Sequence, residues 1–125
     1  FISELFQKFS DIILNNKLIK LKQAKPEYYL RKYIKENLDK SIDINSAAEF
    51  VGRSTSFVTH NFKKRYGKSF HEYLCQARIE HAKTLLRNHS ISDTFQLCGF
   101  KNRYHFSQVF KKIEGITPHE HQLNV

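Results

Sequence analysis

Two copies of one short pattern occur in this sequence, and this internal repeat constrains the fold more than any other feature. In each copy a glycine is followed about ten residues later by Phe-Lys-Lys, two further residues, a second glycine, one residue, and Ser or Thr. The first copy spans residues 52–69 and the second spans residues 99–117. A repeat of this kind indicates a supersecondary unit that is used twice.

Each copy predicts a helix-turn-helix. A glycine before a basic amphipathic helix and another after it indicate a turn and then a helix end. In a helix-turn-helix the second helix is free to lie in a DNA groove. Two copies in one chain therefore predict a molecule that contacts double-stranded DNA twice.

The positive charge of the chain is concentrated on the repeats. The net charge is +9; residues 53–68 carry five basic residues and residues 101–112 carry four, with no acidic residue in either stretch. A groove-binding helix needs basic residues in these places because it approaches phosphates. The charge distribution therefore favours nucleic acid as the partner over a merely soluble basic domain.

Other function classes find little support. No run of eighteen apolar residues and no secretory signal occurs, so we expect no membrane partner. The spacing of Cys75 and Cys98 fits neither a metal site nor a redox motif, and we expect two reduced thiols. The seven histidines include no HExxH pattern, and no phosphate loop, nucleophile elbow or paired carboxylates occur. We expect no catalytic residue, no metal, no cofactor and no enzyme activity.

Periodicity and capping residues predict an all-α chain. Helices are expected over residues 26–40, 42–51, 54–67, 69–87, 90–98, 102–115 and from 117 onward. The expected caps are Asn45 or Ser46, then Ser54, Asn102, and two capping boxes that begin at Ser69 and Thr117. The helix over residues 69–87 is the longest, at roughly 27 Å.

The N-terminal segment carries an apolar stripe at helical spacing within residues 1–14, formed by Ile2, Leu5, Phe6, Phe9, Ile12 and Ile13. Packing on the rest of this domain is the favoured interpretation, while a preceding domain or a second copy stays open. Residues 15–25 are polar and lysine-rich, which favours a linker or a frayed helix end. The chain contains no methionine, so we expect it to be a fragment that lacks N-terminal material.

The core stripe of each recognition helix determines which residues face outward. With Val58 and Phe62 inward, and Phe106 and Phe110 inward, hydrogen-bonding side chains point away from the core. The side chains expected to read bases are Ser56, Thr59, His60, Arg103, Tyr104, Ser107 and Gln108. Those expected to contact phosphates are Lys63, Lys64, Arg65, Lys101, Asn102, Lys111 and Lys112.

Over residues 42–122 the chain resembles the AraC/XylS-type bacterial transcription regulators. The residues that carry the resemblance are Ala47, Ala48, Gly52, Ser54, Phe57, Val58, Phe62, Lys63, Gly67, Phe70, Tyr73, Leu74, Arg78, Ala82, Leu85, Leu86, Ile91, Gly99, Phe100, Tyr104, Phe106, Phe110, Lys111, Gly115, Thr117, Pro118 and His121. The resemblance implies two helix-turn-helix subdomains joined by a long linker helix, with recognition helices in successive major grooves. It also implies a transcription regulator, most often an activator, in the bacterial cytoplasm at the nucleoid.

One departure from the family pattern concerns the first helix of the second unit. The family has a large aliphatic residue and then a small alanine where this chain has Thr94 and Phe95. Because phenylalanine overpacks a close helix crossing, we expect the second unit to be tilted or less tightly held and to contribute less sequence specificity. Leu97 and Cys98 are expected to join a changed packing.

The expected organisation is an N-terminal helix and linker (1–25), a first helix-turn-helix subdomain (26–68), a linker helix (69–88) and a second subdomain (89–125). The alternative function is a helical protein-interaction module that binds RNA polymerase or another regulator with little DNA affinity. Homodimer formation stays open, either through residues 1–14 or through a missing N-terminal domain.

Overall fold

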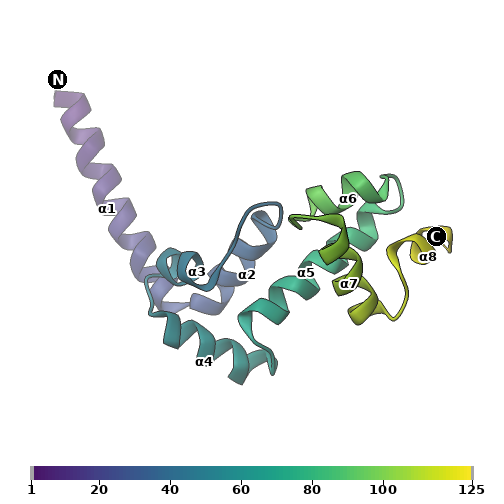
Figure 1. Ribbon diagram of the computed structural model, residues 1–125. Helices are drawn as coiled ribbons and strands as arrows, with labels where there is room; N and C mark the ends of the chain where they lie inside the picture. Colours follow the sequence, from purple (N-terminus) through teal and green to yellow (C-terminus); the bar gives the residue numbers. More distant parts are fainter. Residues whose placement is uncertain (1, 125) are drawn as a thin grey trace.

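The computed structural model describes residues 2–124, which form eight α-helices and no strand (Figure 1). Their bounds are α1 Ile2–Ala24, α2 Pro26–Glu36, α3 Ile44–Val51, α4 Thr55–Tyr66, α5 Phe70–Leu85, α6 Ile91–Leu97, α7 Arg103–Glu114 and α8 Pro118–Leu123. The all-α prediction is confirmed, with two helix-turn-helix pairs, α3–α4 and α6–α7, on either side of α5. No helix within residues 2–124 is both long and apolar enough to cross a membrane.

The first core lies between α2, α3, α4 and the first half of α5. Apolar residues at helical spacing supply it, and Leu30, Val51, Val58 and Phe62 are almost completely buried. Phe62 also contacts Phe70 edge-on at a centroid distance of 5.3 Å, which fixes the start of α5 against α4. The first half of α5 is therefore part of the first helix-turn-helix unit.

The second core lies between the second half of α5, α6 and α7. Its buried residues include Ile79 and Ala82 from α5 and Phe106 and Phe110 from α7. The C-terminal helix α8 packs beside α7, and Gln122 donates hydrogen bonds to two carbonyl oxygens just beyond α5. One helix thus contributes to two separate cores, which makes α5 the connection between the units.

A direct contact joins the two units on one side of α5. The Arg78 guanidinium donates to the carbonyl oxygens of Leu38 at 3.2 Å and Lys40 at 2.8 Å, beyond the end of α2. The same guanidinium lies 5.9 Å from the centre of the Phe100 ring in the turn before α7. Arg78 therefore contacts segments of both units and limits how they can move relative to each other.

The structure corrects the expectation for the N-terminal segment. Residues 15–24 continue α1 without a break and form neither a linker nor a frayed end. The apolar stripe does not pack on this domain, because Phe6 is 72% exposed and Phe9 is 65% exposed. Figure 1 shows α1 extending away from the other helices, with its C-terminal end against α2 and α3.

Several local expectations also differ. Asp43, rather than Asn45 or Ser46, caps α3, and Ser46 completes the capping box as its N3 residue. Helix α2 ends at Glu36 and α5 at Leu85, so α5 has 16 residues and is about 24 Å long. The longest helix is α1 with 23 residues, and not α5 as the sequence predicted. Leu97 is 45% exposed and does not join the core.

Candidate nucleic-acid interface

The first candidate surface is the outer face of α4, which begins directly after the turn at Gly52. Gly52 has a φ of 67°, a left-handed conformation that suits glycine. The Ser54 hydroxyl accepts a hydrogen bond from the Phe57 amide at 3.1 Å and caps α4. Since Val58 and Phe62 are buried, Ser56, Thr59 and His60 are exposed.

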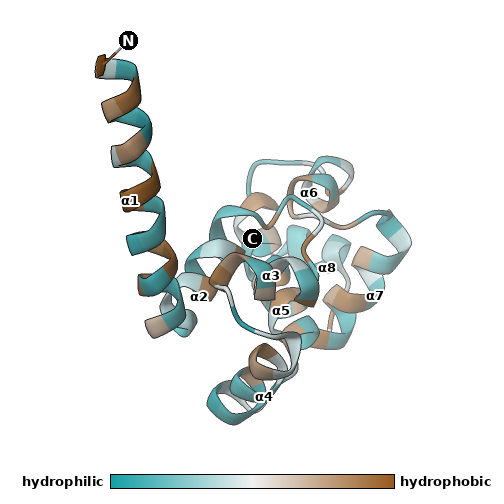
Figure 2. Cartoon of the chain, turned by 90° about the vertical axis from the view of Figure 1, so that its left-hand side faces the viewer, coloured by the Kyte–Doolittle hydropathy of each residue, from teal (hydrophilic) through white to brown (hydrophobic). Residues whose placement is uncertain are grey.

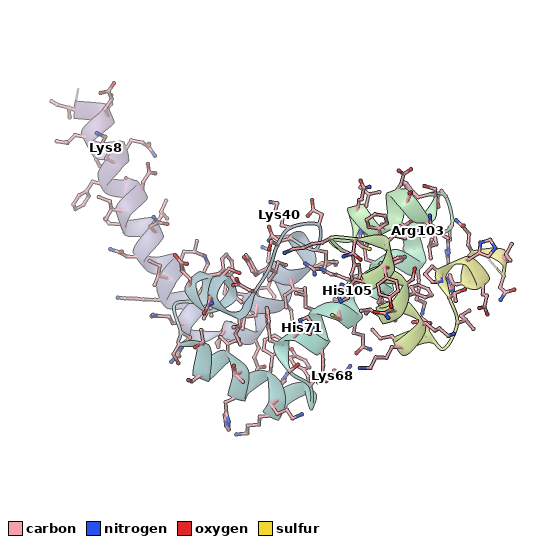
Figure 3. All side chains as sticks on the ribbon, viewed as in Figure 1. Lys8, Lys40, Lys68, His71, Arg103 and His105 are labelled. Atoms are coloured by element: carbon pink, nitrogen blue, oxygen red, sulfur yellow. The ribbon has the colours of Figure 1, made fainter. Side chains whose placement is uncertain are left out.

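The second candidate surface is the outer face of α7. Asn102 caps this helix by accepting from the His105 amide at 2.7 Å. Arg103 and Gln108 are exposed, and Tyr104 is 73% exposed. Ser107 is less accessible, because it lies half-buried at the margin of the core. Figure 3 shows Arg103 at the beginning of α7.

Hydrogen bonds among these side chains modify the predicted set. The Gln108 amide donates to the Tyr104 hydroxyl at 2.7 Å, so the two residues form one polar group one helical turn apart. The Thr59 hydroxyl donates to the Thr55 carbonyl at 2.9 Å, which leaves its oxygen as an acceptor. These contacts orient side chains on both helices before any ligand binds.

The basic residues predicted to contact phosphates fall into two groups, one on each unit. Exposed lysines make up most of both groups: Lys63, Lys64, Lys101, Lys111 and Lys112. Arg65 forms an ion pair with Glu27 of α2 at 3.0 Å, and the Asn102 side chain is occupied as a cap. The capping role of Asn102 was expected from the sequence, whereas the ion pair of Arg65 with Glu27 was not.

A cleft between the two units was not foreseen from the sequence. Its volume is about 480 Å³, and its lining includes Lys68 and His71 near the start of α5 and Lys112 on α7. Figure 3 shows Lys68 and His71 close together at this end of α5. Lys68 belongs to the basic run of the first repeat, but its position opposite α7 depends on the packing of the two units.

The two cysteines show no sign of a chemical role. Both are buried and unpaired by disulfide within the described chain. Burial raises the pKa of the Cys75 thiol, and burial also raises the pKa of the Cys98 thiol to about 12. Both thiols therefore stay protonated near neutral pH. Residues 2–124 contain no group of three His, Cys, Asp or Glu side chains arranged to hold a metal ion.

Comparison with known proteins places this geometry among transcription regulators. A family model described as a helix-turn-helix domain matches residues 47–123. A curated relative, an uncharacterised HTH-type transcriptional regulator in the cgkA 5′ region of Pseudoalteromonas carrageenovora, is 36% identical over 86 residues. That alignment covers 69% of this chain and 52% of the relative, so the chain spans about half the length of that protein.

Solved structures agree with this result. The C-terminal domain of the two-component response regulator yesN from Fusobacterium nucleatum has 27% identity and a TM-score of 0.73, over 78% of this chain and 98% of that one. A transcriptional regulator with an AraC-type DNA-binding domain from Chromobacterium violaceum has 26% identity and a TM-score of 0.71, over 75% and 86%. The similarity covers both helix-turn-helix units, since the matched share is far larger than either unit alone.

Proposed function

Because the chain belongs to the AraC/XylS-type family of helix-turn-helix transcription regulators, we propose that it binds double-stranded DNA sequence-specifically through two recognition helices. Helices α4 and α7 enter successive major grooves on one face of the duplex, and α5 holds them apart. The observation that carries this proposal is the repeated arrangement of a glycine turn, a capped helix and an exposed polar and basic face. DNA-binding regulation of transcription is the shared role of the family; the mode of binding is our proposal.

We assign base readout to Ser56, Thr59 and His60 on α4 and to Arg103, Tyr104, Ser107 and Gln108 on α7. Arginine can form two hydrogen bonds with guanine, and glutamine can do so with adenine, so Arg103 and Gln108 have the greatest capacity to discriminate. The contact between Gln108 and Tyr104 presents both groups as a unit. Arg103 stands at the start of α7, the end of a recognition helix that meets base edges.

We assign phosphate contacts to the basic residues that flank these faces. The exposed lysines on and before the two helices neutralise phosphates and set the position of the protein without specifying sequence. For Arg65, phosphate contact requires exchange of its ion pair with Glu27. That exchange is feasible because the Arg65 side chain is largely exposed and exposed ion pairs are weak, about 0–1 kcal/mol.

The experiment that tests this function is selection of bound sequences from a random duplex pool at two salt concentrations. We expect enrichment of an asymmetric site with two boxes about one helical turn apart. Affinity should fall about 10³–10⁵-fold between 50 and 200 mM salt if six to ten phosphates are contacted. Absence of any enriched sequence, together with weak and salt-labile binding only, would contradict the proposal.

A second candidate function is a helical protein-interaction module with little DNA affinity. The exposed apolar face of α1 favours it, because monomeric proteins rarely expose large contiguous apolar patches.

Within the first proposal we infer that the regulator activates transcription, with RNA polymerase as a second partner. A promoter reporter distinguishes a DNA-binding activator from a protein-interaction module. For the activator, activation should require both an intact operator and the residues assigned to base readout.

A further inference from the structure

The cleft between the two helix-turn-helix units combines positive charge with apolar walls. Its volume is about 480 Å³, which lies within the range of small-molecule sites. Lys68 and His71 line it from the beginning of α5, and Lys112 lines it from α7. Val109 and Ile113 of α7 supply apolar side chains to the same cleft. One ligand can therefore contact a charged and an apolar surface there.

Cys75 lines the cleft from α5 as an uncharged thiol. It is buried, and its sulfur lies 3.6 Å from the Nε2 atom of His71. Burial raises the pKa of the Cys75 thiol, although the positive charges of Arg78 and Lys112 act in the opposite direction. A protonated thiol is a polarisable, weakly polar surface that repels no anion and packs well on apolar groups. The effect of Lys112 on Cys75 also indicates that this lysine of α7 is close to α5.

The two lysines of the cleft have no acidic partner within the described residues. Lys68 is half-buried, and its ammonium donates a hydrogen bond to the uncharged side-chain oxygen of Gln76. None of the ion pairs within residues 2–124 involves Lys68 or Lys112. A partly desolvated ammonium without an anion is unfavourable, and charge-assisted hydrogen bonds to an anionic ligand offset that cost. The cleft therefore favours an anion as its ligand.

The balance of charge in the cleft matches an anion with a single negative charge. Glu72 also lines the cleft, so two lysines face one carboxylate when His71 is neutral. A phosphate monoester carries about two negative charges and would be repelled more strongly by Glu72. A DNA phosphate would also leave the walls formed by Val109 and Ile113 in contact with water. A carboxylate with an apolar body carries one charge and covers these walls.

We propose that this cleft binds a small organic carboxylate with an aliphatic body, held between the beginning of α5 and the second half of α7. The carboxylate accepts hydrogen bonds from the ammonium groups of Lys68 and Lys112 and from the imidazole of His71. The aliphatic body lies against Val109 and Ile113. The ligand thus contacts side chains of both helix-turn-helix units.

A consequence for regulation rests on the proposed function. That function assigns Lys112 to a DNA phosphate, and a carboxylate in the cleft engages the same ammonium group. The carboxylate and the DNA therefore compete for one side chain, so the bound carboxylate lowers the affinity for DNA. By thermodynamic linkage, DNA lowers the affinity for the carboxylate by the same factor. The cleft is then an effector site within the DNA-binding module itself.

An NMR titration of the isotope-labelled chain with sodium octanoate tests the site. Octanoate carries a carboxylate and an aliphatic tail, whereas acetate retains only the charge and octanol only the tail. We expect octanoate to shift backbone amides within residues 68–76 and 109–113. The dissociation constant should be about 1 mM or lower, an ordinary value for about ten non-hydrogen atoms. Acetate and octanol should each bind at least about tenfold more weakly, because each lacks one of the two contacts.

Two variants with opposite expected effects test recognition of the charge. Lys68→Gln removes a cation, and the dissociation constant for octanoate should rise about tenfold with the loss of a charge-assisted hydrogen bond. Glu72→Gln removes the opposing carboxylate and should lower that constant about two- to threefold. Lys35→Gln, on the exposed face of α2, is the matched control and should leave it unchanged. All three positions lie outside the two cores, so folding should be preserved.

The apolar face of α1 is the competing site for an aliphatic tail. Figure 2 shows apolar segments recurring along α1, which stands clear of the remaining helices. Absence of amide shifts, or shifts confined to residues 2–14, would therefore overturn the proposal. Equal affinities for octanoate and octanol, or for octanoate and acetate, would do so too, because only a tail or only a charge would then be recognised. Equal dissociation constants for Lys68→Gln and Lys35→Gln would also contradict it.

DNA binding separates this proposal from the proposed function. The amide shifts are measured without DNA, so they do not depend on an operator. Saturating octanoate should lower the affinity for an operator duplex at least about threefold, and an unchanged affinity would exclude competition at Lys112. Operator binding that weakens in Lys68→Gln, in a chain without octanoate shifts, would assign the cleft to DNA phosphates. Octanoate binding without any operator binding would contradict the DNA-binding function alone.

Discussion

At the scale of the residue, Thr94 stands out as a polar group in the second core. It is fully buried, and its hydroxyl has no hydrogen-bond partner among the described residues. The neighbouring Phe95 is only half-buried, with its ring 6.5 Å from that of Phe106. The phenylalanine is therefore accommodated at the margin of the core, and the clearer cost at this site is the unsatisfied hydroxyl of Thr94.

Replacing Thr94 by valine should stabilise the protein. The change removes a buried hydroxyl without a partner and keeps a β-branched side chain, so the free energy of unfolding should rise by about 1 kcal/mol. Chemical denaturation measures the effect, and Thr84→Val on the exposed side of α5 is the control. A lower stability for Thr94→Val would mean that the hydroxyl is hydrogen-bonded in solution.

Gly99 should tolerate no side chain. Its φ is 90°, and a β-carbon there would lie 2.0 Å from the Leu38 carbonyl oxygen. Gly99→Ala should lower the free energy of unfolding by at least about 3 kcal/mol, since strain and a backbone collision add. Gly67→Ala has a similar φ but nothing within 4 Å, and it should cost about 1–2 kcal/mol. Equal decreases in the free energy of unfolding for Gly99→Ala and Gly67→Ala would show that the backbone at Leu38 can move away from the added β-carbon.

At the scale of the element, we expect α4 and α7 each to contact both DNA phosphates and base edges, through different side chains. Lys63→Ala and Lys111→Ala should weaken binding to all DNA sequences and reduce the salt slope by about 1. His60→Ala and Arg103→Ala should change sequence preference by about 1–3 kcal/mol per good contact. Titration against operator and scrambled duplexes distinguishes the two patterns. Unchanged preference in both of the latter variants would exclude those residues from base readout.

At the scale of the whole molecule, Arg78 contacts both units, and we expect these contacts to fix the spacing between them. Arg78→Ala removes both hydrogen bonds to the segment after α2 and the contact with Phe100. We expect binding to a single box to be retained while the preference for one spacing between two boxes is lost. Binding to duplexes with altered box spacing measures this effect, with Arg87→Ala as an exposed control. If Arg78→Ala kept the natural preference for one box spacing, the distance between the two units would be set by α5 alone.

The second unit should contribute less to sequence specificity than the first. Its core contains the buried Thr94 hydroxyl, which has no hydrogen-bond partner among the described residues and which weakens the packing of α6 beneath α7. Base-by-base substitution in the selected operator should therefore reduce affinity more in the box read by α4. Equal losses in the two boxes would contradict this expectation.

The sequence by itself determined the helices and most of their buried faces. Caps such as Ser54 and Asn102 and stripes such as Val58 with Phe62 act within one or two turns, so local chemistry specifies them. The length of α1 was missed because a polar, lysine-rich stretch can continue a helix when its far end is anchored. That anchor is formed by Gln23 and Arg53, which are 30 residues apart.

Only the tertiary structure decided how the units sit together and which apolar face stays uncovered. The Arg78 side chain donates hydrogen bonds to the carbonyl oxygens of Leu38 and Lys40, which lie 40 and 38 positions earlier in the sequence. The close approach of Gly99 to Leu38 has no local signature in the sequence. Whether the stripe on α1 packs on its own domain depends on where the chain places that helix, since periodicity records only that one face is apolar. The physical reason is general: hydrogen bonds along a helix form between neighbours in sequence, whereas packing joins residues that only the complete fold brings together.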